Sequence, residues 1–475
     1  EPRMRARALP PDQRPEDGVT RWRGRERKQR SSPRKVFSYS KAPECEVWLE
    51  ATEAGHTRFA ANDVTTSGSA RDLTIAIVSR GNGRSGTVRV NDTDEAALKT
   101  AVARSEEVMA AANVDPEWVD GLPAQKYPEI RAAHEATSKA GAPERKSGVK
   151  AALDLARSRK LAASGFSETT VRWAALANKK GNFGFSASTS AGFSTTMRTE
   201  DGTGSGWAGL EAPDFSSIPA AELARRAAKK AEESAKPRDL PPGRYTVVFE
   251  PQAVSDLLGN LNSVLSRRAA DEGRSFFAKP GGGNRIGERI FSESVTIHSD
   301  PFDARVPGRP WIGSAGGGFL GFGGFAGGNF AGLPARKTTW IEKGVLRNLS
   351  IDRYWAKKIE EEPLPFSGGI VMEGGTGTVE DLVAGTERGL LLTRFWYIRT
   401  VNPQTVQLTG LTRDGVWLIE KGKVVGPVNN FRFNDSPVNL LKNMEAMSAA
   451  VSTGDMVVPG IRSRDFNFTS KSDAV

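Results

Sequence analysis

Short runs of alternating apolar and polar residues open the chain, a pattern typical of half-buried strands. These runs lie at residues 45–51, 57–62, 73–79 and 85–90. The glycine-rich segment 80–84 predicts a hairpin turn between the last two runs. Asn91 or Thr93 can then cap a helix whose apolar residues recur near helical spacing up to about Ala112. This part of the chain therefore predicts strands followed by one helix.

A linker rich in proline and glycine follows, up to about Pro128. We expect alanine-rich helices at 130–140 and 147–161, and a helix of Ala, Lys and Glu at 218–235. Strands are expected within 166–194, around a turn at 178–181, and again at 203–212. Residues 237–243 then hold three prolines and a glycine, which cannot continue a helix and mark the best domain boundary.

The second half begins with a strand at 244–250 and a helix that Pro251 starts as a first-turn proline. Apolar residues at helical spacing extend that helix to Leu265. Glycine turns then separate a series of strands, with one helix expected among them at 437–448. The strands are expected at 295–298, 338–349, 389–398, 405–411, 416–420 and 423–428.

Runs of strands with segregated helices favour an α+β fold over a doubly wound sheet. We predict a disordered basic tail at 1–35, an N-terminal mixed α/β module at 36–236, and a mostly β C-terminal module at 237–475 with a barrel-like sheet. The 475 residues are too many for one ordinary core, which favours two modules.

The net charge of +10 is placed unevenly along the chain. Residues 1–35 hold twelve Lys and Arg against five Asp and Glu, so this tail carries +7 and the other residues share about +3. A nucleic-acid site would need basic residues interleaved with aromatics, and the tail offers only Trp22. We therefore expect no nucleic-acid partner and interpret the tail as a disordered segment or a misassigned start.

The stretch from Trp311 to Ala335 has no charged residue and in this respect resembles a membrane-spanning segment. Ten of the 21 residues at 313–333 are glycine, and each glycine disfavours a helix by about 1 kcal/mol relative to alanine. We predict a flexible surface loop at 313–333 and no membrane contact. A single cysteine, Cys45, and the lack of an apolar stretch after the basic N-terminus fit a cytoplasmic location.

Several short motifs, none specific alone, occur together in a defined order. They are TRFAAN at 57–62, ANKKG at 177–181, LPPGRYTVVFEPQAV at 240–254, GRSFF at 273–277, EKGVL at 342–346, NPQT at 402–405 and WLIEKG at 417–422. In this order and at these separations the chain resembles the TldD/PmbA family of peptidase subunits over about residues 44–470.

Catalytic members of that family carry His-Glu-x-x-x-His on the helix after the Glu-Pro step, where two histidines hold zinc and the glutamate activates water. They also use a late cysteine. The resemblance places Gly259 and Asn260 at the first His and the Glu positions and Val264 at the second His position. No histidine lies between His134 and His298. The resemblance thus implies no catalytic residue, metal ligand or cofactor in this chain, with zinc expected in a TldD-type partner.

The other candidate sites lack the partners that their chemistry requires in a metal, phosphate or nucleophile site. They are three histidines, two glycine-rich turns, two serines and one carboxylate pair: His56, His134, His298, residues 374–378 and 281–283, Ser275, Ser436, Asp271 and Glu272. The simpler interpretation is that each of these residues or segments is an isolated surface or turn position.

The resemblance implies the metal-free PmbA/TldE-type branch, whose subunit pairs with a TldD-type zinc subunit in a heterodimer that trims small or unfolded peptides. A peptide held by strand addition needs an accessible sheet edge. The strand near 390–400 is the candidate edge, with Arg394, Tyr397, Arg399 and Asn402 facing the peptide. A homodimer stays open.

Two alternatives to this non-catalytic subunit also stay open. One is an active homomeric peptidase with a site outside the family pattern, and the other is a peptide-binding or assembly protein without a proteolytic role. Three features depart from the family: the charged tail, the glycine-rich loop, and Val406, which follows Asn-Pro-Gln-Thr where the family often has glycine.

Overall fold

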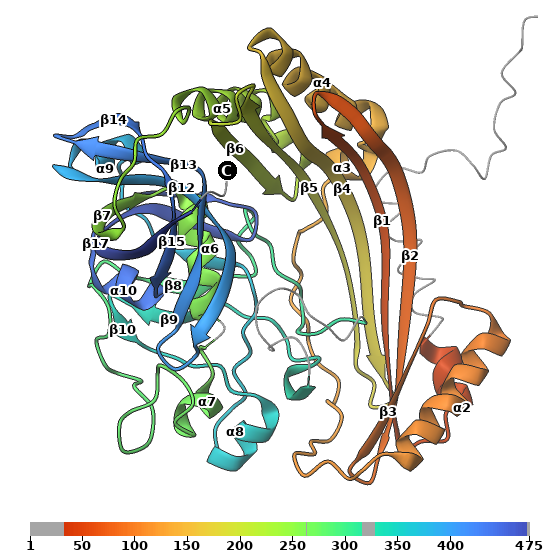
Figure 1. The fold of residues 1–475 in the computed structure, drawn as a ribbon. Helices are drawn as coiled ribbons and strands as arrows, with labels where there is room; N and C mark the ends of the chain where they lie inside the picture. The colour runs from red at the N-terminus through yellow and green to blue at the C-terminus, as the bar shows by residue number, and fades with distance from the viewer. Residues whose placement is uncertain (1–32, 263, 316–327, 473–475) are drawn as a thin grey trace, which may run out of the picture.

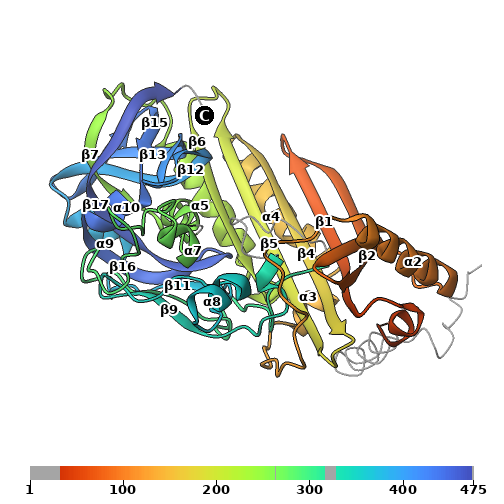
Figure 2. The same cartoon turned by 90° about the horizontal axis from the view of Figure 1, so that it is seen from below.

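The computed structural model describes residues 33–262, 264–315 and 328–472. Figure 1 shows two bodies side by side, one built on long bent strands and the other on a curled sheet. Figure 2 shows the same arrangement from below, with helix α2 (Glu95–Ala111) at the end farthest from the curled sheet. The fold is α+β, as predicted. The predicted tail lies outside the described residues up to residue 32, and residues 33–39 are helical.

A six-stranded antiparallel sheet, the N-terminal sheet, has the order β3-β2-β1-β4-β5-β6. Its strands are β1 (Glu44–Ala60), β2 (Asp63–Gly81), β3 (Arg84–Val90), β4 (Leu161–Asn178), β5 (Phe183–Thr199) and β6 (Ser205–Ala212). The runs predicted as separate strands at 45–51 and 57–62 are one strand, because the polar residues between them pair with both β2 and β4. The predicted turns at 80–84 and 178–181 are confirmed.

Alternate side chains of a strand point to opposite faces of a sheet. The two faces of the N-terminal sheet pack against different parts of the molecule. Val47 and Phe59 belong to the helix-covered face, where residues 33–39 and α2 pack at one end and α4 (Ala142–Ser158) and α5 (Ala220–Glu233) at the other. Trp48 belongs to the opposite face, which looks toward the C-terminal body.

Two of the predicted helices in this half have different bounds. Only α3 (Glu135–Lys139) is helical within 130–140, because Ala132 forms a parallel bridge with Ser188 of the sheet. The helix predicted at 147–161 is α4, which begins five residues earlier. Pro143 lies in its first turn and the Glu144 carboxylate accepts the N–H of Gly141 at 2.7 Å.

An eleven-stranded sheet forms the C-terminal body, and five of its strands close into a ring. The order is β10-β9-β8-β11-β17-β15-β13-β12-β7, and β7 also pairs with β17, so β7, β12, β13, β15 and β17 form the C-terminal barrel. The strands are β7 (Gly243–Phe249), β8 (Ile297–Ser299), β9 (Thr338–Glu342), β10 (Val345–Leu346), β11 (Ile370–Met372), β12 (Arg388–Asn402), β13 (Gln407–Glu420), β14 (Lys423–Pro427), β15 (Asn430–Asp435), β16 (Met444–Ser452) and β17 (Met456–Ser472).

Short helices connect these strands, and several of their bounds correct the sequence predictions. They are α6 (Pro251–Asn262), α7 (Arg267–Asp271), α8 (Arg353–Ile359), α9 (Val379–Ala384), α10 (Pro437–Lys442) and the 3-10 turn η3 (Gly328–Phe330). The 3-10 turn η2 (Phe215–Ser217) lies in the N-terminal half, between β6 and α5. The helix predicted at 437–448 is wrong in its second half, because residues from Met444 onward pair with β17 as β16. The helix predicted to reach Leu265 ends at Asn262, because the chain then enters a bridge between Ser266 and Ser350.

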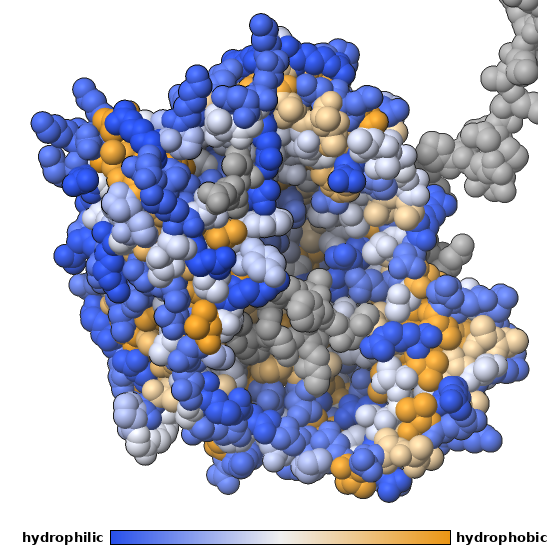
Figure 3. Space-filling view, in the orientation of Figure 1, coloured by the Kyte–Doolittle hydropathy of each residue, from blue (hydrophilic) through white to orange (hydrophobic). Residues whose placement is uncertain are grey.

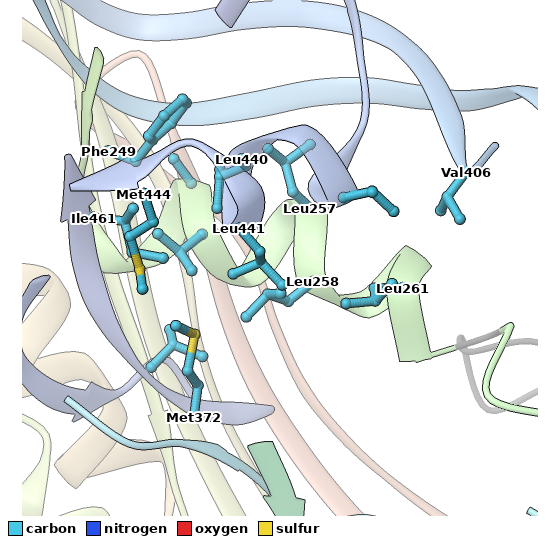
Figure 4. Close-up of a cluster of buried hydrophobic side chains, with 14 of the residues drawn as sticks. Phe249, Leu257, Leu258, Leu261, Met372, Val406, Leu440, Leu441, Met444 and Ile461 are labelled. Atoms are coloured by element: carbon cyan, nitrogen blue, oxygen red, sulfur yellow. The ribbon is translucent and has the colours of Figure 1, made fainter. Parts of the chain in front are cut away.

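Helix α6 lies with one face in the main hydrophobic core. Leu257, Leu258 and Leu261 of α6 lie beside Leu440 and Leu441 of α10, as Figure 4 shows. Each of these leucines is at most 1% exposed, and burying one such side chain contributes roughly 1.5–3 kcal/mol. Apolar packing therefore fixes the position of α6 in the barrel.

Trp311, from the C-terminal half of the chain, packs against the N-terminal sheet. Its side chain is 2% exposed and packs with Trp48 and Leu176 on the face opposite the helices. The rings of Tyr127 and Trp311 meet edge to face with centroids 5.4 Å apart. The two bodies thus meet at a buried aromatic contact that includes Trp311.

The glycine-rich segment 313–333 is anchored at its described ends. Ile312, Phe330 and Leu333 are buried around Leu122, so these parts are not the surface loop that was predicted. Residues 316–327 lie outside the described residues. None of the helices in the described part of the chain combines the length and apolar character that crossing a bilayer requires.

Replacing Trp311 with alanine is expected to destabilise the protein by about 3–5 kcal/mol, the usual cost of truncating a buried aromatic side chain. Thermal denaturation followed by circular dichroism should show a clear fall in the midpoint. Trp396→Ala is the matched control, because Trp396 is 47% exposed, and its midpoint should stay close to that of the parent. Equal midpoints for both variants would show that Trp311 does not hold the two bodies together.

Candidate functional site

A cavity of about 260 Å³, the central cavity, lies between the N-terminal sheet and the C-terminal body. Figure 3 shows the surface hollowed between the two bodies. The wall from the sheet is formed by Phe166, Glu168, Gly192, Phe193, Ser194, Trp207, Gly209, Leu210 and Glu211, and the wall from the C-terminal body by Gln252, Arg394, Thr453 and Asp455. The register places Glu168, Trp207 and Glu211 on the same sheet face as Trp48.

Two glycines keep this space open. A Cβ atom on Gly192 would lie 3.4 Å from the side chains of both Glu168 and Glu211. A Cβ atom on Gly209 would lie 2.6 Å from the ring of Trp207. The absence of side chains on neighbouring strands β5 and β6 therefore creates the hollow.

Helix α6 presents a polar stripe of Gln252, Asp256 and Asn260 on the side away from its leucines. These residues are four apart and so share one helix face. The Gln252 side chain donates to Asp256 Oδ1 at 2.9 Å, and Asn260 donates to the Asp256 carbonyl oxygen at 3.2 Å. Asp256 Oδ2 accepts the backbone N–H of Phe395 at 2.8 Å, so the stripe also ties α6 to β12.

A buried carboxylate joins the two bodies beside the cavity. Asp414 is fully buried and accepts the Ser205 hydroxyl at 2.6 Å from the N-terminal sheet. It also accepts Arg394 Nε at 2.8 Å and Arg394 Nη2 at 2.6 Å. The Arg394 guanidinium carbon lies 4.5 Å from the ring centroid of Trp207, a cation–π contact across the same junction. Asp414 and Gly415 have φ values of 58° and 123°, but β13 continues through them as one strand, so the two separate strands predicted at 405–411 and 416–420 are wrong.

Four carboxyl groups at or beside the cavity have raised pKa values. Burial is the main cause of the raised pKa of Glu168, Glu211 and Asp455, and the negative charges of Asp455 and Glu168 raise the pKa of Glu211 further. Burial raises the pKa of Asp256 to about 6. The central cavity is therefore a place where negative charge is poorly solvated.

Strand β12 has an accessible edge beyond the cavity. Its ladder with β7 ends at Leu392, while its ladder with β13 continues to Asn402. The next N–H on that side, from Phe395, is taken by Asp256. Among the described residues no strand pairs with β12 on this side from Trp396 to Asn402, and most of these side chains are exposed.

The four residues predicted to face a peptide lie along this strand but do not form one cluster. Arg394 lines the central cavity, whereas Tyr397 is 60% exposed. The Arg399 guanidinium lies over the Tyr397 ring at 4.2 Å. The side chain of Asn402 accepts the backbone N–H of Gln404 at 2.9 Å and so closes the hairpin turn. The structure thus brings Tyr397 and Arg399 together and leaves the other two at either end.

Sequence reasoning missed part of this surface. Trp396 is 47% exposed and Arg413 of β13 lies 4.6 Å from its ring centroid. A second aromatic–arginine pair therefore stands beside Tyr397 and Arg399. The apolar and aromatic residues in β12 were visible in the sequence, but the pairing of Arg413 with Trp396 depends on the strand register.

Val406 explains why glycine suits the turn after Asn-Pro-Gln-Thr. Its φ is 53°, a left-handed conformation that costs a side-chain-bearing residue roughly 1–2 kcal/mol. The Val406 side chain is 2% exposed in the main core, and this burial offsets the backbone strain.

The three histidines contact different parts of the fold. His56 stacks on Phe166 with centroids 5.6 Å apart, and His134 Nδ1 lies 3.6 Å from Asp214. His298 lies on β8, where burial lowers its pKa. In the described part of the chain, no group of three or more His, Cys, Asp or Glu side chains is arranged to hold a metal ion.

The two serines and the carboxylate pair have structural partners. The Ser436 hydroxyl caps α10, and the Ser275 hydroxyl donates to the Val264 carbonyl oxygen at 3.0 Å. Asp271 forms an ion pair with Arg267 at 3.0 Å, and Glu272 one with Arg268 at 3.1 Å. The two glycine-rich segments form turns: Lys279 N–H donates to Gly283, and Thr378 caps α9.

Comparison with known families identifies both halves of the fold. The model of the PmbA/TldA metallopeptidase central domain matches residues 130–235, and that of the C-terminal domain matches residues 242–470. The chain belongs to the PmbA/TldD family. No curated protein matches the sequence.

Solved structures share the PmbA/TldD fold at low sequence identity. TldE from Thermococcus kodakarensis is 19% identical, with a TM-score of 0.78 over 92% of this chain and 98% of that one. A protein from Bacteroides thetaiotaomicron described as a candidate modulator of DNA gyrase is 19% identical, with a TM-score of 0.78 over 93% of this chain and 98% of that one. A Thermotoga maritima protein with the same description is 16% identical, with a TM-score of 0.79 over 93% and 100%.

The PmbA/TldD ligand positions inferred from the sequence fall around the end of α6. Gly259 is buried in the helix and Asn260 belongs to its polar stripe. Val264 lies beyond the last helical residue, Asn262, rather than one turn further along the same helix as was expected. The three positions therefore do not share one helix face in this member of the family.

The raised pKa of Asp256 predicts a pH-dependent stability difference. The folded pKa of about 6 lies above the ordinary value of 3.8, so the folded state binds more protons in that window and stability falls as pH rises through it. Asp256→Asn removes this titration but keeps an oxygen that can accept the Phe395 N–H. The variant should gain on the order of 2 kcal/mol relative to the parent between about pH 4 and pH 7. A difference between the two proteins that does not change with pH in denaturant titrations would contradict this assignment.

Proposed function

We propose that this chain is a non-catalytic, zinc-free cytoplasmic subunit of a TldD/TldE-type metallopeptidase complex that trims small or unfolded peptides. The observation that carries the proposal is the chemistry of α6, which has glycine and asparagine at positions 259 and 260 although the family fold around it is complete. Zinc would then be held by a TldD-type partner. The similarity in fold to TldE from Thermococcus kodakarensis supports this placement.

The contribution of this chain to peptide handling would be the accessible edge of β12. Its backbone groups can pair with an extended peptide, which gives affinity without requiring one particular sequence. The pairs of Tyr397 with Arg399 and Trp396 with Arg413 offer flat surfaces for peptide side chains. The β12 edge begins next to Arg394, which lines the central cavity. This cavity can hold a terminal residue of the peptide.

Pairing with the partner is tested by coexpression with a TldD-type subunit encoded in the same genome. We expect a 1:1 complex that contains zinc and cleaves peptides, while the chain alone holds no stoichiometric zinc and cleaves nothing. Size-exclusion chromatography with light scattering, metal analysis and a peptide-cleavage assay provide the measurements.

Two results would refute the proposal. Stoichiometric zinc with peptidase activity in the pure chain would make it an active homomeric enzyme. Failure to associate with the partner at micromolar concentration would instead favour a separate binding or assembly protein.

The β12 edge is tested in the complex with Tyr397→Ala and Arg399→Ala. Each variant should raise the KM for peptide about five- to tenfold, since it removes roughly 1 kcal/mol of peptide contact, and leave kcat nearly unchanged. Arg225→Ala on α5 is the control, because Arg225 is an exposed residue paired with Glu222 at 2.7 Å. An unchanged KM in both β12 variants would remove this edge from the peptide path.

A further inference from the structure

Another cavity, the outer cavity, lies on the helix-covered face of the N-terminal sheet and has no role in the proposed function. Its volume is about 390 Å³. Its floor is formed by β1, β2 and β4, and its roof by the segment that enters α4. The N-terminal sheet separates it from the central cavity, so the two cavities do not share side chains.

The outer cavity contains a buried cation that forms no ion pair with any other described residue. Arg145 of α4 is 4% exposed, and its Nη1 donates to Thr169 Oγ1 at 2.9 Å and to the Ala140 carbonyl oxygen at 3.3 Å. Its Nε is buried and has no hydrogen-bond partner. None of the ion pairs among the described residues includes Arg145. Burial lowers the pKa of Arg145, and the charge of the nearby Glu144 opposes this effect only in part, so the lowered pKa reflects the cost of holding the guanidinium away from water.

The floor of the cavity is shaped to fit the guanidinium group. A Cβ atom on Gly55 would lie 2.5 Å from Arg145 Nη1 and 2.7 Å from both its Cζ and its Nη2. The guanidinium group therefore rests directly on the backbone of β1, and only glycine leaves this space. Ser69, paired with Gly55 across β1 and β2, also lines the cavity with a small polar side chain.

The amino end of α4 adds further positive potential. This helix has 17 residues, and Gly141 and Ala142 at its start line the cavity. Pro143 in the first turn has no N–H and the Gly141 N–H is taken by Glu144, so the aligned peptide dipoles are what make this end favourable for anions.

Two carboxylates reduce this potential but do not neutralise Arg145. Glu144 accepts the N–H of Gly141 at 2.7 Å, which satisfies one of the donors at the helix start. Glu53 is paired with Arg71 at 3.6 Å. Among the described residues neither carboxylate therefore forms an ion pair with Arg145.

We propose that the outer cavity binds the oxyanion group of a small molecule, a carboxylate or a phosphate, through Arg145 and the amino end of α4. A guanidinium with free donors matches the geometry of both groups. The volume exceeds that of a bare ion, so the rest of the molecule would lie over the small side chains of the floor. The oxyanion would provide the direct ion pair that Arg145 lacks among the described residues.

The test is titration calorimetry of the purified full chain at low ionic strength, with inorganic phosphate and acetate as separate probes. Saturable binding of phosphate identifies a phosphate site, and saturable binding of acetate alone identifies a carboxylate site. Arg145→Gln should weaken that binding about 10- to 100-fold, because it removes a charge-assisted contact. Arg225→Gln makes the same chemical change at an exposed site and should keep the parent affinity.

Gly55→Ala is the second variant, and it retains Arg145. The added methyl group would displace the guanidinium from its place, so the same loss of anion binding is expected without loss of the charge. Circular dichroism establishes that each variant is folded, and if Arg145→Gln fails to fold, Gly55→Ala decides alone. The proposal is overturned if neither probe binds saturably to the parent, or if the folded variants bind as tightly as the parent.

Discussion

The Asp414 carboxylate is the contact on which the relation between the two bodies depends. It is fully buried, and its partners come from both bodies: Ser205 from the N-terminal sheet and Arg394 from the barrel. A buried carboxylate without such partners would cost several kcal/mol, so the pairing is obligatory once Asp414 is inside. Because Arg394 also stacks on Trp207, the same group of residues sets the width of the central cavity. The cavity is therefore a consequence of how the bodies are joined.

The N-terminal sheet gives each cavity its own chemistry because its two faces carry different side chains. One face meets the barrel and gathers carboxyl groups with raised pKa values around Arg394. The other lies under α4 and holds Arg145 over Gly55. Strands β1 and β4 contribute to both faces through alternating residues, as the neighbours Glu168 and Thr169 show. A shift of one residue in the register would exchange these sets, so both cavities depend on the long unbroken pairing of the sheet.

Alternation and turn residues predicted most strands of this fold, and the misses have definite physical causes. β1 was divided because its middle residues are polar, yet they pair on both sides and need no apolar side chains to stay in the sheet. β16 was taken for helix because a sequence such as that from Met444 to Ala450 suits a helix, and only its pairing with β17 decides otherwise. For the candidate site, the exposed end of β12 could be predicted, since strand and aromatic residues are local signals. Glu168, Glu211 and Asp455 could not, because three separate elements bring them together.

Under the proposed function, the structure of α6 explains how a family member could lack zinc ligands and keep its fold. The leucine side of the helix supplies the packing against α10, and Gly259 and Asn260 lie outside that leucine face, whereas Val264 is partly buried against the same core. Asn260 lies in the polar stripe, while Val264 lies beyond the helix end. The polar stripe keeps a structural role, because the Asp256 carboxylate accepts the N–H of Phe395 at the point where β7 no longer pairs with β12. Of the three inferred positions, Gly259 and Asn260 are thus separate from the leucine packing that holds the scaffold. Under the proposed function, the edge of β12 remains available for a peptide whose cleavage would take place in another chain.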